Sequence, residues 1–311
     1  MYDREAVQFF DIAHEGAFVR AASALLDDGQ VAQLRELQPR SLIVIAADDI
    51  SRAAAELAVA VLAPLPVPIT IVGQLPRFAG PLDAVLLASS KSAPAQERCL
   101  HEASRRACPT YLIAPPKGPL REEAPSDTYV IPVPPNAAGG SPACVIAAMV
   151  ALVGGLTAPD QAVREQLELV AQAVDEELLA VTPERDALVN ESRKIREFAG
   201  EDRVVHTGFG EIPTALARLI ATWWVSKGLV CGALEATELG AALPDFNENA
   251  SDIFYDPFED DVAPVLPLRI VVWAAQDTHL PRAIAQSSGG DDLALDNVLR
   301  LMVRGLAATV M

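Results

Sequence analysis

The strongest constraint on the fold is an alternation of apolar runs and helical patterns over the first half of the chain. Helices are indicated at residues 50–62 and 95–107. Strands connected by helices of about 10–15 residues form parallel βαβ units with right-handed crossovers. The pattern therefore predicts an α/β fold, and five apolar runs supply its strands: 41–47, 68–72, 82–88, 110–114 and 128–132.

The same order of strand, polar turn and helix returns in the second half of the chain, which indicates a weak duplication. Residues 41–62 show this order first, and residues 203–226 repeat it with glycines in the turn. A later strand is expected at 268–273 and a closing helix at 296–310. Two further stretches lack a clear strand pattern and are predicted to be a polar loop and a mobile loop, at 243–250 and 285–292 respectively.

These repeats predict two domains of ordinary size joined by helices. We expect an N-terminal helical cap and a first domain within residues 1–157, a helical connection at 158–200 and a second domain at 201–311. Pro183 is a candidate break between two long helices of the connection. The predicted architecture is two parallel sheets flanked by helices, each a flavodoxin-like three-layer sandwich, with a ligand crevice at the carboxyl ends of the strands.

Charge and hydropathy exclude several classes of partner. The formal net charge is −18, so nucleic acid and anionic lipid would be repelled. A small anionic ligand is still compatible with this charge, because helix N-termini and single cations act locally. The most apolar run, residues 143–156, is shorter than the ~20 residues that a membrane span needs and is expected to form a buried helix.

The cysteines indicate neither disulfides nor a metal. None of them forms a Cys-x-x-Cys pair, and no histidine lies at metal-ligand spacing from Cys99, Cys108, Cys144 or Cys231. The N-terminus has acidic residues and lacks the apolar core of a signal peptide. We therefore expect reduced, mostly buried thiols in a cytoplasmic protein without a metal site.

Four segments, at 130–135, 190–208, 243–249 and 298–302, occur in an order that resembles the bifunctional phosphoglucose/phosphomannose isomerases, which contain two sugar-isomerase (SIS) domains. Val130–Pro135 resembles the family's Ile-Pro-Ile-Pro-Pro segment, and Asn190–Ile195 followed by Val204–Gly208 resembles its Asn-Pro-Ala-Lys helix and second-domain strand. Leu243–Asn249 resembles its Leu-Pro-Glu-Leu-Asn-His-Asn loop, and Val298–Met302 its closing helix. The resemblance implies a homodimer that binds a small sugar phosphate, without a cofactor.

The family's phosphate loop, Ser-Gly-Asn-Thr-Glu-Glu, corresponds here to Ser89-Ser90-Lys91-Ser92-Ala93-Pro94. The resemblance implies that the three hydroxyls bind phosphate, with Lys91 in support; an ordinary solvated turn is the alternative. The glycine-rich turn after the family's first strand is replaced by 46–51, which leaves Ser51 as a further candidate for sugar binding. Asp48 and Asp49 in this turn either bind a ligand or cap the following helix, which is the commoner role.

The family's catalytic positions are altered. Its glutamate base lies in an Asn-Glu-Asn-Ala-Lys motif, but the matching residues 227–232 contain no carboxylate, and its ring-opening histidine corresponds to Glu248. Glu248 is therefore the candidate proton carrier, ahead of Glu235 and Glu238, which could equally lie on a solvated surface. His206, at a strand end before glycines, is a second catalytic candidate, although a structural histidine is the alternative.

Two functions are compatible with these residues. The first is an aldose–ketose isomerase that converts glucose 6-phosphate or mannose 6-phosphate into fructose 6-phosphate by proton transfer. The second is a catalytically inactive SIS-domain protein that binds a sugar phosphate or nucleotide sugar, or acts as a partner subunit. The altered catalytic positions favour the second function, while the conserved hydroxyls of the loop favour a ligand in either case.

Overall fold

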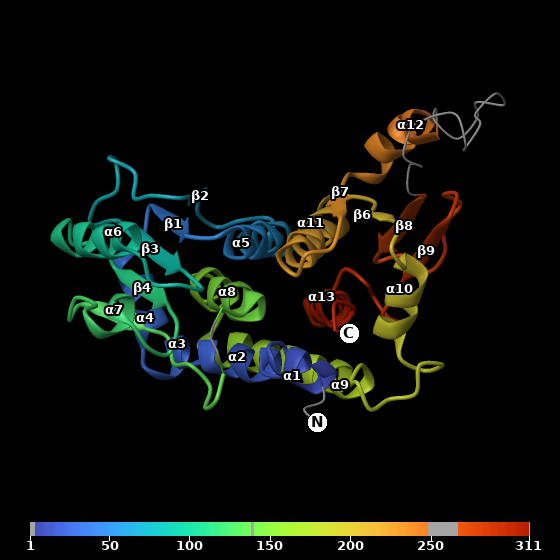
Figure 1. Ribbon diagram of the computed structural model, residues 1–311. Helices are drawn as coiled ribbons and strands as arrows, with labels where there is room; N and C mark the ends of the chain where they lie inside the picture. The colour runs from blue at the N-terminus through green and yellow to red at the C-terminus, as the bar shows by residue number, and fades with distance from the viewer. Residues whose placement is uncertain (1–3, 138–139, 248–266, 311) are drawn as a thin grey trace.

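The computed structural model describes residues 4–137, 140–247 and 267–310. It contains two separate parallel sheets with helices packed between and around them (Figure 1). The strands of the first sheet lie in the order β2-β1-β3-β4-β5, which is the flavodoxin-like order. The predicted strands are all present, as β1 (Ser41–Ala46), β2 (Ile69–Val72), β3 (Asp83–Ala88), β4 (Thr110–Ile113) and β5 (Thr128–Val130).

The second sheet repeats the order of the first four strands, as β7-β6-β8-β9. Its central strands β6 (Arg203–Thr207) and β8 (Leu268–Trp273) were expected, whereas β7 (Cys231–Ala233) and β9 (Ala283–Gln286) were not. The prediction of a mobile loop over 285–292 is therefore wrong for its first two residues, which belong to β9. They pair with β8 in parallel, with Ala285 opposite Val272 and Gln286 opposite Trp273.

Alternate side chains of β1 point to opposite faces of the first sheet, as the strand period requires. Leu42 and Val44 face the core between the two sheets, where α5 (Asp49–Leu62) and α8 (Pro142–Met149) pack. Ile43 and Ile45 face a separate core beneath the outer helices α6 (Pro94–Arg105) and α7 (Pro119–Glu122). Since all six residues of β1 are buried, both helix layers are needed to cover the sheet.

The second sheet is covered in the same way. Its inner face packs on α11 (Glu211–Ser226) and α13 (Leu295–Ala307), and its outer face on α12 (Ala236–Asn247). The expectation of a polar loop over 243–250 is wrong for residues 243–247, which lie in α12 with Pro244 inside the helix. Leu239, Leu243 and Phe246 have the spacing of one helix face and contact the outer core, which explains why this segment is helical.

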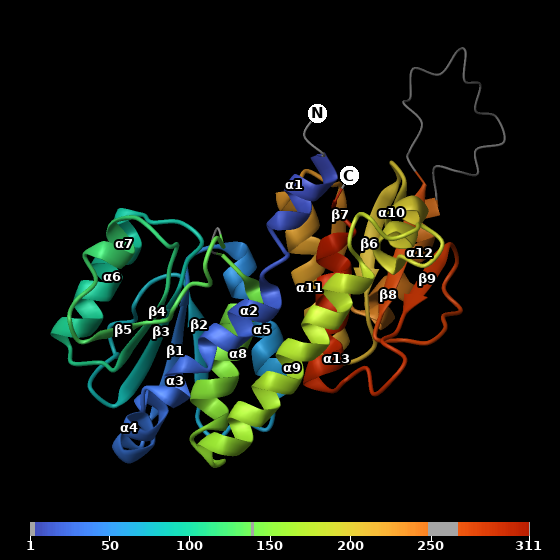
Figure 2. The ribbon, with the colours of Figure 1, turned by 90° about the horizontal axis from the view of Figure 1, so that it is seen from below.

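The two halves share one continuous core, because several helices touch both of them (Figure 2). In the centre, α5 of the first half lies directly against α11 of the second. The connection is formed by α9 (Asp160–Ala180) and α10 (Glu191–Ala199), in agreement with two helices separated near Pro183. The domain boundaries at 157/158 and 200/201 stay predictions. The remaining helical elements are α1 (Arg4–Phe10), α2 (Glu15–Ala22), α3 (Ala24–Asp27), α4 (Gln30–Leu37) and the π-helical turn η1 (Val150–Gly154).

The apolar segment at 143–156 forms the buried helix α8 and continues into η1. Ser141 caps α8 by accepting a hydrogen bond from the amide of Cys144 at 3.0 Å. Glu15 from α2 adds a second acceptor, because its Oε2 lies 2.7 Å from Ser141 Oγ and 3.0 Å from the amide nitrogen of Ala143. Among the described residues, every helix is too short or too polar to cross a membrane.

A buried ion pair joins α9 to α13. Nε of Arg304 lies 2.7 Å from Oε1 of Glu177, and the two side chains are 10% and 6% exposed. Nη1 of the same arginine donates to the carbonyl oxygen of Ser287 at 2.9 Å, just after β9. The ion pair thus holds α9, in the connection between the two halves, against α13, the closing helix of the second half.

Candidate functional site

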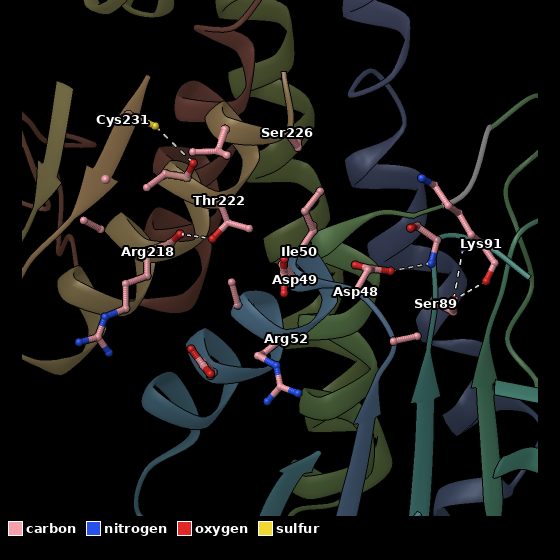
Figure 3. Close-up of a pocket in the computed structure, with 18 of the residues that line it drawn as sticks. Asp48, Asp49, Ile50, Arg52, Ser89, Lys91, Arg218, Thr222, Ser226 and Cys231 are labelled. Atoms are coloured by element: carbon pink, nitrogen blue, oxygen red, sulfur yellow. Dashed lines mark hydrogen bonds between the residues drawn. The ribbon is translucent and has the colours of Figure 1, made fainter. Parts of the chain in front are cut away.

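A cleft of about 890 Å³ lies between the two halves, and its first-half side is at the carboxyl ends of β1 and β3 (Figure 3). The first half supplies the residues after β1, the start of α5 and the loop after β3, and the second half supplies one side of α11 and strand β7. This is the position at which open α/β sheets bind ligands. The polar and charged residues that line the cleft are Asp48, Asp49, Arg52, Glu56, Ser89, Ser90, Lys91, Gln96, Arg218, Thr222 and Ser226.

Asp48 connects the two first-half loops that border the cleft. Its Oδ1 accepts a hydrogen bond from the amide of Ser51 at 2.8 Å, which caps the N-terminus of α5. Its Oδ2 accepts a second hydrogen bond from the amide of Ser90 at 2.9 Å, in the loop after β3 (Figure 3). The expectation that Asp48 caps a helix is confirmed, and the same carboxylate also accepts a hydrogen bond from the neighbouring loop.

The loop after β3 is largely hydrogen-bonded within itself. Ser89 is buried, and its hydroxyl donates to the carbonyl oxygen of Lys91 at 2.5 Å. Ser89, Ser90 and Lys91 line the cleft, whereas Ser92 is absent from the lining and accepts a weak hydrogen bond from the amide of Leu120 at 3.4 Å. The structure thus brings three of the four predicted loop residues to the cleft. Ser51 is buried behind them and contributes its amide to the cap of α5.

Three cations reach the cleft from different elements: Arg52 from α5, Lys91 from the loop after β3 and Arg218 from α11. Within the described residues, none of the three side chains forms an ion pair or a hydrogen bond. Asp48, Asp49 and Glu56 bring three negative charges to the same lining, so its formal charge is zero in a chain of −18. The cleft is therefore less acidic than the protein as a whole, and its cations are free to contact an anion.

The second half contributes a hydroxyl group and a thiol to the lining of the cleft. The hydroxyl of Thr222 donates to the carbonyl oxygen of Arg218 at 2.8 Å, within α11. The thiol of Cys231 lies 3.4 Å from the carbonyl oxygen of Ala221, and burial raises the pKa of Cys231 to about 11. Cys231 is therefore a neutral thiol at physiological pH and is poorly suited to act as a nucleophile.

Of the two catalytic candidates, His206 does not line this cleft. His206 is fully buried inside the second half, where its Nδ1 accepts a hydrogen bond from Nε1 of Trp273 at 3.1 Å and its ring lies edge-on to Trp224. Burial lowers the pKa of His206 to about 3, so the imidazole is uncharged at neutral pH. Of the two nitrogens, Nε2 is buried without a hydrogen-bond partner among the described residues. Glu248 lies outside the described residues, and so does the rest of the segment Leu243–Asn249 beyond Asn247.

Glu235 and Glu238, the other carboxylates considered, lie near the start of α12 and are absent from the cleft lining. Glu235 accepts hydrogen bonds from the amides of Thr237 and Glu238, at 2.8 and 3.3 Å. Hydrogen bonding, with Thr237 the largest contributor, lowers the pKa of Glu235. A residue held as a carboxylate in this way is a poor candidate for a base that must take up a proton near neutral pH.

Sequence reasoning missed Arg52 and Arg218, although a signal for Arg218 was present. Arg218 is the one charged residue of α11 after Glu211, whereas Arg52 shares α5 with Asp49 and Glu56. A single charge in a helix such as α11 marks a place where the buried face gives way to solvent or a ligand. Within the described residues, no cluster of three His, Cys, Asp or Glu side chains has the geometry of a metal site.

Comparisons with solved structures match nearly the whole chain. The C-terminal domain of glucosamine-fructose-6-phosphate aminotransferase from Francisella tularensis has a TM-score of 0.65 and 16% identity, with 99% of this chain and 95% of that chain covered. A tagatose-6-phosphate ketose/aldose isomerase from Escherichia coli has a TM-score of 0.58 and 12% identity, with 97% and 91% covered. The sequence matches no protein-family profile and no curated protein.

These similarities define the class of the fold. The chain shares the fold of these proteins, with two parallel sheets flanked by helices. At this level of identity the likeness concerns the fold, and the finer resemblance to the bifunctional phosphoglucose/phosphomannose isomerases rests on the sequence segments alone.

Proposed function

We propose that this protein binds a sugar phosphate in the cleft between its two SIS domains. The observation that carries the proposal is the set of three cations without ion pairs, Arg52, Lys91 and Arg218, in the lining of the cleft. The chain has a net charge of −18, and cations without an ion pair around a cleft favour an anionic ligand. The cleft volume of about 890 Å³ lies within the usual range for small-molecule sites.

The polar groups of the cleft support a sugar as the rest of the ligand. Ser90, Thr222, Ser226 and Gln96 offer hydroxyl and amide groups, and the carboxylate of Glu56 can accept hydrogen bonds from sugar hydroxyls. Structures of the same fold include proteins whose names refer to phosphosugars, such as the tagatose-6-phosphate isomerase of Escherichia coli. A hexose 6-phosphate combines the anionic and hydroxyl groups that this lining can bind.

Arg218→Gln is expected to weaken the affinity for glucose 6-phosphate, mannose 6-phosphate or fructose 6-phosphate by about tenfold or more. A hydrogen bond to a charged partner contributes about 1.5–3 kcal/mol, and about 1.4 kcal/mol corresponds to a factor of ten. Isothermal titration calorimetry at low and at physiological salt measures the effect, which should shrink at higher ionic strength. Arg185→Gln is the matched control, because Arg185 is exposed and lies outside the cleft lining. Equal affinities for the two variants would contradict the proposal.

Isomerisation of glucose 6-phosphate or mannose 6-phosphate to fructose 6-phosphate is a second candidate function. Its support is the fold shared with a ketose/aldose isomerase, together with the sequence alignment of Glu248 with the family's ring-opening histidine. If Glu248 carries the proton, Glu248→Gln should lower the rate of fructose 6-phosphate formation by about 10²–10⁴-fold, as expected for general acid–base catalysis. A coupled assay measures this rate. Binding of sugar phosphate without turnover in the native protein would leave only the binding function.

A further inference from the structure

One backbone amide in the loop after β3, at the edge of the cleft, already donates to a side chain of the protein. The loop leads into α6, whose N-cap residue Ala93 provides no side-chain acceptor. Backbone amides at the start of a helix attract anions, and phosphate is the usual ligand. Here the amide of Ser90 donates to Oδ2 of Asp48 at 2.9 Å. The acceptor at this position is thus an internal carboxylate.

Asp48 is held in this position from both sides. Its other oxygen, Oδ1, accepts the amide of Ser51 at 2.8 Å in the cap of α5, so rotation of the carboxylate away from Ser90 would also disturb the cap. Hydrogen bonds to an ionised acceptor are stronger than those between neutral groups. A phosphate that approached Ser90 would have to displace this carboxylate or tolerate its charge at short range.

The surroundings of Ser90 leave the loop little freedom to rearrange. Gly140, in the segment after β5, has a φ of +80°, and a Cβ on Gly140 would lie 2.9 Å from Cβ of Ser90. The backbone at Gly140 therefore packs directly on Ser90. The hydroxyl of Ser89 is also engaged, since it donates to the carbonyl oxygen of Lys91 at 2.5 Å.

We propose that Asp48 is a specificity-determining residue whose carboxylate takes the place of a ligand phosphate at the Ser89–Lys91 loop. The loop then receives an uncharged, hydroxyl-bearing part of the ligand, because a hydroxyl can donate to the free lone pairs of Asp48 whereas a phosphate would be repelled. The phosphate of the ligand is then bound by the two arginines of the cleft that form no ion pair, Arg52 and Arg218. This inference rests on the proposed function, since it assigns an orientation to the sugar phosphate.

The test uses inorganic phosphate as the probe and three variants of the full chain. In Asp48→Asn the amide oxygen can still cap α5, but the amide group turned toward Ser90 is a donor and releases the backbone N–H. Asp48→Ser also keeps a capping oxygen and leaves the amide of Ser90 without its acceptor. Asp49→Asn is the matched control, because it removes the same charge from the same cleft without a hydrogen bond to the loop.

Both Asp48 variants are expected to bind inorganic phosphate at least tenfold more tightly than the native protein, whereas Asp49→Asn should change the affinity by less than about threefold. Calorimetry gives the affinity, and the ¹⁵N–¹H resonance of Ser90 should shift on phosphate addition only in the Asp48 variants. Thermal denaturation verifies that each variant is folded. The inference is overturned if both Asp48 variants bind phosphate no more tightly than Asp49→Asn, or if the Ser90 resonance of the native protein shifts with phosphate.

The two proposals fail in different ways. If the native protein binds no hexose phosphate but the Asp48 variants gain phosphate affinity, the role of Asp48 stands and the proposed function does not. If the native protein binds hexose phosphate and the Asp48 variants bind phosphate no better than the control, the proposed function stands and the role of Asp48 is refuted.

Discussion

Glu177→Ala is expected to lower the free energy of unfolding by about 3–5 kcal/mol, because it leaves the buried guanidinium of Arg304 without its ionic partner. Arg304 and Glu177 are 10% and 6% exposed, and their closest atoms are 2.7 Å apart. The hydrogen bonds from Arg304 to Gln286 and to the carbonyl oxygen of Ser287 compensate only part of the charge. Urea denaturation of the native protein and the variant measures the difference.

The neighbouring pair on the same two helices provides the control. Arg300 contacts Glu176, but there the glutamate is 65% exposed, so Glu176→Ala should cost less than about 1 kcal/mol. Replacing both members of the buried pair by apolar residues, Glu177→Leu with Arg304→Met, should recover much of the loss, since no unpaired charge remains. A cost for Glu177→Ala that is no larger than the cost for Glu176→Ala would show that the buried pair is not a major source of stability.

Glu15→Gln is expected to stabilise the protein at pH 8 by about 3 kcal/mol more than at pH 4.5. Burial is the main cause that raises the pKa of Glu15 from 4.5 to about 7, against the opposing hydrogen bonds from Ser141 and Ala143. Between these two values the folded protein retains a proton that the unfolded chain has lost. The stability contributed by the protonated group is therefore complete below pH 4.5 and is lost as the pH rises to about 7.

A shift of about 2.5 pKa units corresponds to about 3 kcal/mol, which is the source of the expected magnitude. Glutamine resembles the protonated acid, because its amide oxygen can accept the hydrogen bonds from Ser141 and Ala143 without a charge. Urea denaturation of both proteins at several pH values measures the difference, and Glu184→Gln, at an exposed position, serves as the control. A difference between native protein and Glu15→Gln that stays constant from pH 4.5 to 8 would refute the expectation.

The sequence predicts the strands well where an apolar or β-branched run is unbroken and poorly where the run is short and interrupted. The runs that became β1 and β3 are buried at every position, so composition alone identifies them. Strands β7 and β9 are short and half-buried, and Gly232 and Gln286 interrupt any apolar pattern there. The stretch at 243–247 looks like a loop because of Pro244, yet its leucine and phenylalanine contacts with the outer core stabilise a helix.

The residues of the candidate site also differ in how far the sequence alone could place them. The loop Ser89–Lys91 and Asp48 could be placed in advance, because each follows a strand and the carboxyl ends of parallel strands meet at one edge. Arg52 and Arg218 could not, since their positions depend on how α5 packs against α11 from the other half of the chain. The sequence does not fix which sheet face His206 takes, and the contacts of its ring with Trp224 of α11 and Trp273 of β8 place it in the buried core.

The packing of α2 against α9 also affects the order in which parts of the protein can fold during synthesis. Arg20 of α2 pairs with Glu168 of α9, and the two residues are 148 positions apart. At translation rates of about 5–20 residues per second, α2 leaves the ribosome roughly 7–30 s before this partner is synthesised. Phe18 and Val19 are buried in the final structure, and during this interval they lack their full set of contacts. Completion of the first domain during synthesis therefore depends on the helix that connects it to the second.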